Sequence, residues 1–90
     1  MASNNVNYTL IHSIEFGDRE IKELSIRRLK AKDLMALKSD PTPADMGNLI
    51  SKTTGEAIAV INELDAADFL AISDILGNFM QAGQKNGPAL

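Results

Sequence analysis

The chain contains no cysteine and no tryptophan, and its aromatic residues are limited to three phenylalanines and one tyrosine. Because cysteine is missing, disulfides and thiolate metal sites are excluded. The core of these 90 residues has to be built mainly from Leu, Ile, Val, Ala and Met. No apolar run approaches the roughly 20 residues that a membrane-spanning helix needs, and the polar amino terminus lacks the pattern of a secretion signal. We therefore expect one small domain that stays where it is made.

The sequence also lacks the residue patterns of an active site. His12 is the only histidine, and it stands on the apolar side of a predicted strand without an acid or nucleophile at a familiar spacing. One histidine cannot supply the ligands that zinc needs. The glycines are scattered and form neither GxxxxGK nor GxGxxG. We therefore expect no catalytic, metal-binding or cofactor-binding residues, and a protein that is not an enzyme.

Basic and acidic residues are separated along the chain. Between Arg19 and Lys38, seven bases and three acids give a net charge of +4. Between Asp40 and Gln84, one base and seven acids give −6. This distribution indicates either complementary faces within one fold, which we favour, or head-to-tail association between molecules into a homo-oligomer.

Residues 27–32, with the sequence Arg-Arg-Leu-Lys-Ala-Lys, form a basic cluster. A protein that binds DNA through charge normally has a basic domain, stacking aromatics or a recognition helix. This chain has a pI near 4.9 and no aromatic residue in the cluster. In a strand, Arg27 and Arg28 would also point to opposite faces. We therefore expect no nucleic-acid binding, and we favour a solvated face or pairing with the acidic half.

Residues 8–29 have the pattern of a β-hairpin. Residues 8–16 are rich in β-forming side chains. Gly17-Asp18 supplies a turn, because glycine accepts the positive φ of tight hairpin turns, and residues 19–29 continue as a second strand. The side chains expected on one face of the first strand are Leu10, His12, Ile14 and Phe16.

The sequence leaves two registers open for this hairpin. A two-residue loop would set Ile14 opposite Ile21, which is favourable, but Glu15 opposite Glu20. A four-residue loop would set Glu15 opposite Lys22 instead. Since like charges directly opposite each other are destabilising, we favour a loop longer than two residues.

Helices are expected over residues 32–38, 44–54 and 56–63, and from residue 66 until Gly83 at the latest. In the third of these, Ile58 and Ile61 are expected to face inward. The residues assigned to turns and caps are Gly17, Asp18, Asp33, Gly55, Asp65 and Asp68. The predicted fold is thus α+β, a β-hairpin (8–29) followed by three to four short α-helices (31–83) in a single domain (8–83). Residues 1–7 are predicted to be disordered and residues 84–90 to form a flexible tail.

The last predicted helix carries an amphipathic stripe, to which we assign both core packing and the border of a partner-binding surface. Leu70, Ala71 and Ile75 lie off the stripe, so a second side of the helix is also apolar. The pattern leaves open whether the stripe forms the core alone or the core and an interface. Gly77 indicates either close approach of another helix or a hinge. The residues of the stripe are Phe69, Ile72, Leu76, Phe79 and Met80.

Several short segments occur in a fixed order, and together they resemble one protein family. They are Ile14-Glu15-Phe16-Gly17-Asp18, Glu23-Leu24-Ser25-Ile26-Arg27, Asp33-Leu34, Thr54-Gly55, Leu64-Asp65 and Asp68-Phe69. Over roughly residues 9–79 the chain resembles the tail assembly chaperones of contractile-tailed bacteriophages, typified by the E proteins of P2-like phages and the corresponding proteins of Mu-like phages. It departs from them at two places. Family members often have proline or threonine where this chain has Leu29-Lys30, and they often have proline where it has Glu56-Ala57.

The resemblance implies a non-enzymatic role in virion assembly. Such a protein would act in the cytoplasm of the bacterial host, bind the tape measure protein, help recruit tail tube subunits, and be absent from the mature virion. Two alternatives remain: a permanent small structural tail protein, and, less favoured, a small DNA-binding regulator. Without the resemblance, the residues support only a small α+β binding module.

Overall fold

The structure is a computed structural model that describes residues 5–86, with side chains described as far as residue 80. Two strands are followed by four helices, which confirms the predicted α+β fold class. The predicted disordered amino terminus and flexible tail fall partly on residues 1–4 and 87–90, which lie outside the described residues. The elements are β1 (Val6–Phe16), β2 (Arg19–Ile26), α1 (Ala31–Ala36), α2 (Pro43–Thr54), α3 (Ile58–Ile61) and α4 (Ala66–Asn86).

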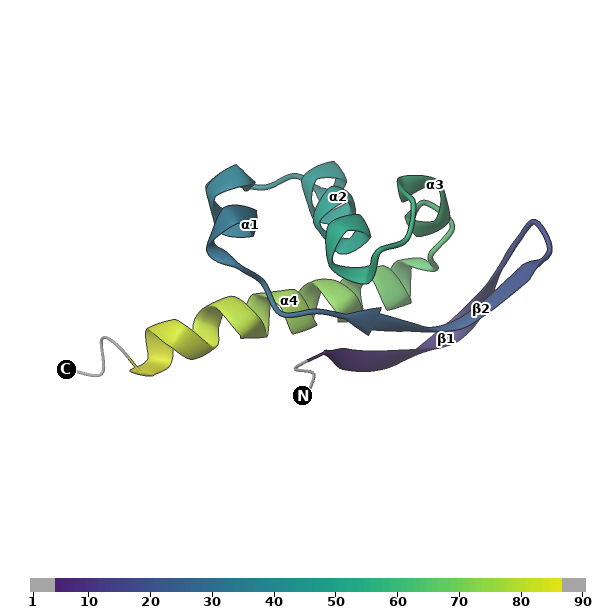
Figure 1. The fold of residues 1–90 in the computed structure, drawn as a ribbon, viewed down its shortest axis with the longest axis horizontal. Helices are drawn as coiled ribbons and strands as arrows, with labels where there is room; N and C mark the ends of the chain where they lie inside the picture. The colour runs from purple at the N-terminus through teal and green to yellow at the C-terminus, as the bar shows by residue number, and fades with distance from the viewer. Residues whose placement is uncertain (1–4, 87–90) are drawn as a thin grey trace.

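The elements form two layers, one of α1, α2 and α3 and the other of α4 and the hairpin (Figure 1). α1, α2 and α3 lie in a row on one side, and α4 runs along the other side of the molecule beside the strands. α2 contacts β2, α3 and α4, while α4 contacts β1 as well. The carboxyl-terminal end of α4 extends beyond α1, because the helix continues to Asn86 instead of ending by Gly83 as predicted. The extents of the molecule are 50 × 32 × 22 Å.

The hairpin has the register that we considered less favourable. Ile14 pairs with Ile21 and Glu15 with Glu20, so the loop contains only Gly17 and Asp18. Gly17 has a φ of 63°, which glycine adopts without strain. The prediction of a longer loop was wrong, because burial of Ile14 and Ile21 outweighs repulsion between two carboxylates that are both exposed to solvent.

β1 carries three more residues than β2 between two regular stretches of pairing. Thr9 pairs with Glu23, and Ile14 pairs with Ile21. Residues 10–13 therefore lie opposite the single residue Lys22, and the ladder is interrupted by a large bulge. The bulge breaks the predicted alternation, so His12 is exposed instead of lying on the apolar face.

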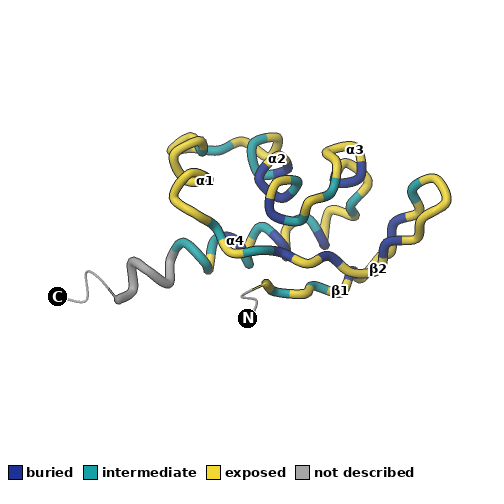
Figure 2. The backbone as a smooth tube through the Cα atoms, viewed as in Figure 1, coloured by how far each residue is buried: buried dark blue, intermediate teal, exposed yellow. Residues whose placement is uncertain are grey.

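The core lies where the hairpin, α2, α3 and α4 meet (Figure 2). Both strands contribute to it, but α1 contributes no apolar side chain and buries only Asp33. Ile58, which was predicted to face inward, is 42% exposed, because α3 is a single short turn that buries only its last two residues. The buried apolar residues are Leu10, Ile14, Ile21, Leu24, Ile26, Leu49, Ile50, Val60, Ile61, Ile72 and Leu76.

Local hydrogen bonds explain where the helices begin and end. At the start of α2, the Thr42 hydroxyl accepts from the Asp45 amide, and the Asp45 carboxylate accepts from the Thr42 amide, which forms a capping box. Gly55 ends α2 with a left-handed φ of 78°. At the start of α4, Asp65 Oδ2 accepts from the Ala67 amide at 2.9 Å.

Candidate functional site

The apolar stripe of α4 is divided between the core and the surface. Ile72 and Leu76 are completely buried, so they hold α4 against the strands and α2 and are closed to any partner. Phe69, Phe79 and Met80 are half-buried. These three side chains are therefore the part of the predicted stripe that a second molecule can reach.

Arg28 lies over the half-buried Phe79. The centre of its guanidinium is 5.0 Å from the centroid of the phenyl ring, within the range of a cation–π interaction. The contact joins the segment after β2 to the carboxyl-terminal half of α4. Arg28 thus covers one face of the Phe79 ring. Because Arg28 is exposed, its side chain is free to move away from that face.

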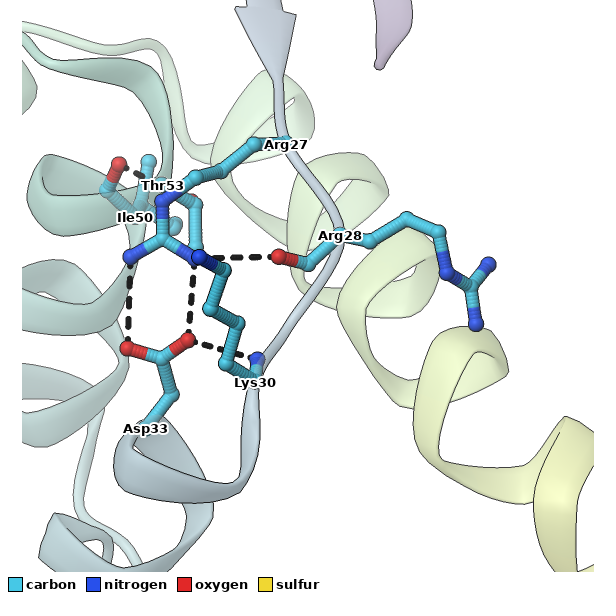
Figure 3. A network of polar contacts seen from close by, with 6 residues as sticks. All are labelled: Arg27, Arg28, Lys30, Asp33, Ile50 and Thr53. Atoms are coloured by element: carbon cyan, nitrogen blue, oxygen red, sulfur yellow. Dashed lines mark hydrogen bonds and ion pairs between the residues drawn. The ribbon is translucent and has the colours of Figure 1, made fainter. Parts of the chain in front are cut away.

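Arg27 points the opposite way, toward the buried Asp33 of α1 (Figure 3). Its two terminal nitrogens donate to the Asp33 carboxylate at 2.9 and 3.3 Å, and Nη1 also donates to the Arg28 carbonyl. The Arg27 amide donates to the Thr53 carbonyl of α2 at 3.0 Å. Both arginines of the basic cluster thus have partners within the chain. They point in opposite directions (Figure 3), but not as neighbours in a strand as predicted, because β2 ends at Ile26.

This network stabilises the charged form of Asp33. The Arg27 guanidinium, followed by the Lys30 amide that donates to Oδ2 at 2.8 Å, lowers the pKa of Asp33 to about 2. Asp33 and Arg27 help to hold α1 at its position. The apolar side chains of α1 itself do not belong to the core, but Leu29 and Leu37, which flank the helix, pack against it.

Asp68 is the second fully buried carboxylate, and its partners lie on β1. The Tyr8 hydroxyl and the Ile11 amide donate to Oδ1 at 2.8 and 2.9 Å, and the His12 amide donates to Oδ2 at 3.0 Å. Burial opposes ionisation of Asp68, but these three donors outweigh it and lower the pKa of the carboxyl. Asp68 lies in the first turn of α4, where it was predicted, but the three donors to its carboxylate belong to β1 and not to α4, so it fastens that turn to the bulge in β1.

An apolar groove of about 450 Å³ lies between α2, α3 and the start of α4. Gly47 forms its floor, because a Cβ at that position would meet Ile58 Cδ1 at 3.8 Å and Phe69 Cε1 at 3.9 Å. Phe69 is the member of the α4 stripe that faces this groove. Other lining residues are Pro43, Ala44, Ile61 and Leu64.

Large apolar side chains are exposed at several further places. Leu34 and Met35 protrude from α1 with exposed fractions of 45% and 81%. Leu70 on α4 and Ile11 in the bulge are 63% and 67% exposed. A Cβ at Gly77 would meet no atom within 4 Å, so no element of the described chain approaches this glycine closely. Apolar surface is therefore available on both layers of the molecule.

Within residues 5–86, no group of three or more His, Cys, Asp or Glu side chains is arranged to hold a metal ion. No helix in the same range is long and apolar enough to cross a membrane.

The chain matches the model of one protein family. The model of the family described as phage tail assembly chaperone proteins, E, or 41 or 14, matches residues 7–81. The chain belongs to this family. No curated protein and no solved structure is similar enough to this chain to match it. The predicted resemblance to tail assembly chaperones is thus confirmed, and the match covers the fold from β1 into α4.

In this tail assembly chaperone, the structure separates the five residues of the predicted stripe instead of gathering them in one site. Phe69 faces the groove, Phe79 lies under Arg28, and Ile72 and Leu76 belong to the core. The sequence pattern predicted neither the groove nor the exposed side of α1. A periodic pattern reports only the faces of one helix, whereas the groove is formed by three helices that meet only in the folded chain.

Proposed function

We propose that this tail assembly chaperone binds the tape measure protein without catalysing a reaction, and that it helps recruit tail tube subunits around that protein. It acts in the cytoplasm of the bacterial host and leaves before the virion matures. The observation that supports this proposal is the half-buried apolar surface on α4, presented by a member of the tail assembly chaperone family.

The tape measure protein is proposed to bind beside Phe79 and Met80 on α4. Both side chains are half-buried, so they expose apolar surface without being released from the fold. Methionine is flexible and adapts to varied contact surfaces. Arg28 covers one face of the Phe79 ring, and displacement of Arg28 would expose more of the ring to a partner. Such a surface suits binding that has to be reversed when the tail is complete.

Co-expression with the tape measure protein of the same phage tests this assignment. We expect Met80→Ser to reduce co-purification of the tape measure protein by about tenfold, in line with the loss of a central apolar contact. Asn78→Ser is the matched control, because Asn78 is an exposed polar residue on the same helix, and it should leave co-purification unchanged. Equal capture by wild type and Met80→Ser would contradict the assignment to α4.

Mass spectrometry of purified mature virions separates the chaperone from a permanent structural tail protein. We expect the chain in assembling lysates and not in finished particles. A constant number of copies in each finished particle would favour the structural alternative, whichever surface binds the tape measure protein.

A further inference from the structure

The groove between α2, α3 and α4 lies in a part of the chain with almost no positive charge. No lysine or arginine occurs over residues 39–51 or 53–84, and Lys52 lines the hollows beside Asp33 instead. The exposed Glu63 and Asp65 flank Leu64 of the groove lining. Arg19 of the hairpin is paired with Glu56 at 2.9 Å and does not line the groove. The groove is therefore lined mainly by apolar side chains, with Asn48 and Asn62 among them, and two exposed acids flank its lining.

α1 presents the complementary surface. Met35 is its most exposed apolar residue, and Leu34 beside it is also exposed. Lys30, Lys32 and Lys38 are exposed around these two residues. The only acid of α1, Asp33, is buried and paired with Arg27, so it leaves most of the positive charge of the exposed lysines unpaired, although Lys32 also lies near Asp33 and Lys38 near Asp45. α1 is thus a basic projection with an apolar tip.

We propose that α1 of one molecule docks into the groove of a second copy of this chain. Leu34 and Met35 would enter the apolar groove, and the surrounding lysines would face the two acids that flank its lining. Two complementary surfaces on one chain, one basic and one acidic, make a second copy the occupant that these observations favour over an unrelated cationic partner.

The arrangement of the elements places the two surfaces apart within one molecule. α1 and α3 lie on opposite sides of α2 in the same layer (Figure 1), so α1 lies away from the groove of its own molecule. The contact therefore joins different molecules. Repeated head to tail it gives a ring or an open row with one groove and one α1 free at its ends, and made twice across a two-fold axis it gives a closed dimer.

Sedimentation velocity over a range of concentrations and salt tests the proposal. We expect the wild-type chain to associate at low ionic strength and to dissociate as salt screens the charges. Met35→Glu on α1 and Ile58→Glu in the groove should each weaken association by about tenfold or more, because each would bury a carboxylate in an apolar contact. Asn78→Glu adds the same charge at an exposed position of α4 and should have no effect.

Mixing the two variants gives the sharper measurement. The Met35→Glu chain keeps an intact groove, and the Ile58→Glu chain keeps an intact α1. Each should be monomeric alone, and an equimolar mixture should form a 1:1 complex that grows no further. Circular dichroism of each variant shows that it is folded. A monomeric wild type, a mixture that does not associate, or association that only Asn78→Glu abolishes would overturn the proposal, and the last result would place the interface on α4.

These outcomes are distinguishable from failure of the proposed function. Binding of the tape measure protein is assigned to Phe79 and Met80, which lie outside the groove and outside α1. A chain that binds the tape measure protein as a monomer would overturn only the head-to-tail association. A chain that associates with itself but ignores the tape measure protein would overturn only the assignment to α4.

Discussion

Two carboxylates are buried in this chain, and each is charged for a different structural reason. Asp33 is paired with the guanidinium of Arg27 and holds α1 to the segment after β2. Asp68 is held by a hydroxyl and two backbone amides of β1. Donors face both oxygens of each carboxylate, and a neutral amide of the same shape could accept at only one of the two positions, so both residues make the stability of the fold depend on pH.

Replacement of Asp33 by asparagine should remove the first of these contributions. The folded pKa of about 2 lies below the ordinary value of 3.8 for this carboxyl, so the charged carboxylate stabilises the fold above about pH 4, and this contribution is lost as the pH falls toward 2. At pH 7 we expect Asp33→Asn to lower the free energy of unfolding by about 2 kcal/mol. Urea unfolding at pH 7 and at pH 2 measures the difference.

The control for this experiment is Asp40→Asn, at an exposed position before α2. It should change the free energy of unfolding by less than about 0.5 kcal/mol at either pH. If Asp33→Asn and wild type lose stability in parallel between pH 4 and pH 2, Asp33 is not the group responsible.

At the scale of single elements, α4 contains a glycine that its own fold does not require. Gly77 lies in a helix, where glycine is less favourable than alanine by about 1 kcal/mol, and a Cβ there would contact nothing within 4 Å. The absence of a close neighbour within the described chain leaves an external helix or a hinge as the explanation. Only the first of these explanations places a binding partner against Gly77.

We expect Gly77→Ala to raise the free energy of unfolding by about 1 kcal/mol, because it removes backbone freedom from the unfolded chain without adding a clash. Thermal unfolding followed by circular dichroism measures this gain. Gly55→Ala is the control, and it should destabilise the chain because Gly55 has a φ of 78°. A stabilised Gly77→Ala chain that captures less tape measure protein would place a partner helix against Gly77. Unchanged capture would exclude that contact.

At the scale of the whole molecule, Asp68 joins two segments that are 57 residues apart in sequence, α4 and the bulge in β1. We expect Asp68→Asn to lower the free energy of unfolding by about 3 kcal/mol, because an amide cannot accept as a carboxylate does and leaves buried donors unsatisfied. Tyr8→Phe removes one donor and keeps both backbone bonds, so it should cost only about 1 kcal/mol. Chemical denaturation measures both changes.

Hydrogen exchange provides a local test of the same contact. The amides of Ile11 and His12 should exchange slowly in wild type and in Tyr8→Phe, and quickly in Asp68→Asn. Equal protection of both amides in all three chains would show that Asp68 does not hold the bulge.

Prediction from sequence succeeded where the signal is local. Gly17 at the hairpin turn, Gly55 at the end of α2 and the apolar period of α4 each depend on the backbone within a few residues. It failed where distant segments decide the outcome. The bulge in β1 depends on a carboxylate from α4, so alternation alone placed His12 on the wrong face. The two-residue hairpin loop depends on how deeply Ile14 and Ile21 are buried.

The same limit applies to the candidate surfaces. The sequence located the α4 stripe, but burial by the hairpin and α2 decided that Ile72 and Leu76 are closed to partners. The groove and the exposed tip of α1 follow from how short elements are arranged in space, and neither leaves a periodic pattern in the chain.

The bulge in β1 also limits how molecules of this chain can join through their strands. A sheet of two strands has two open edges, and an open edge readily accepts a further strand, which is a route to amyloid-like stacking. The Ile11 and His12 amides are already bonded to Asp68 and cannot pair with an incoming backbone. The surplus residues therefore protect the centre of β1 from uncontrolled edge-to-edge growth.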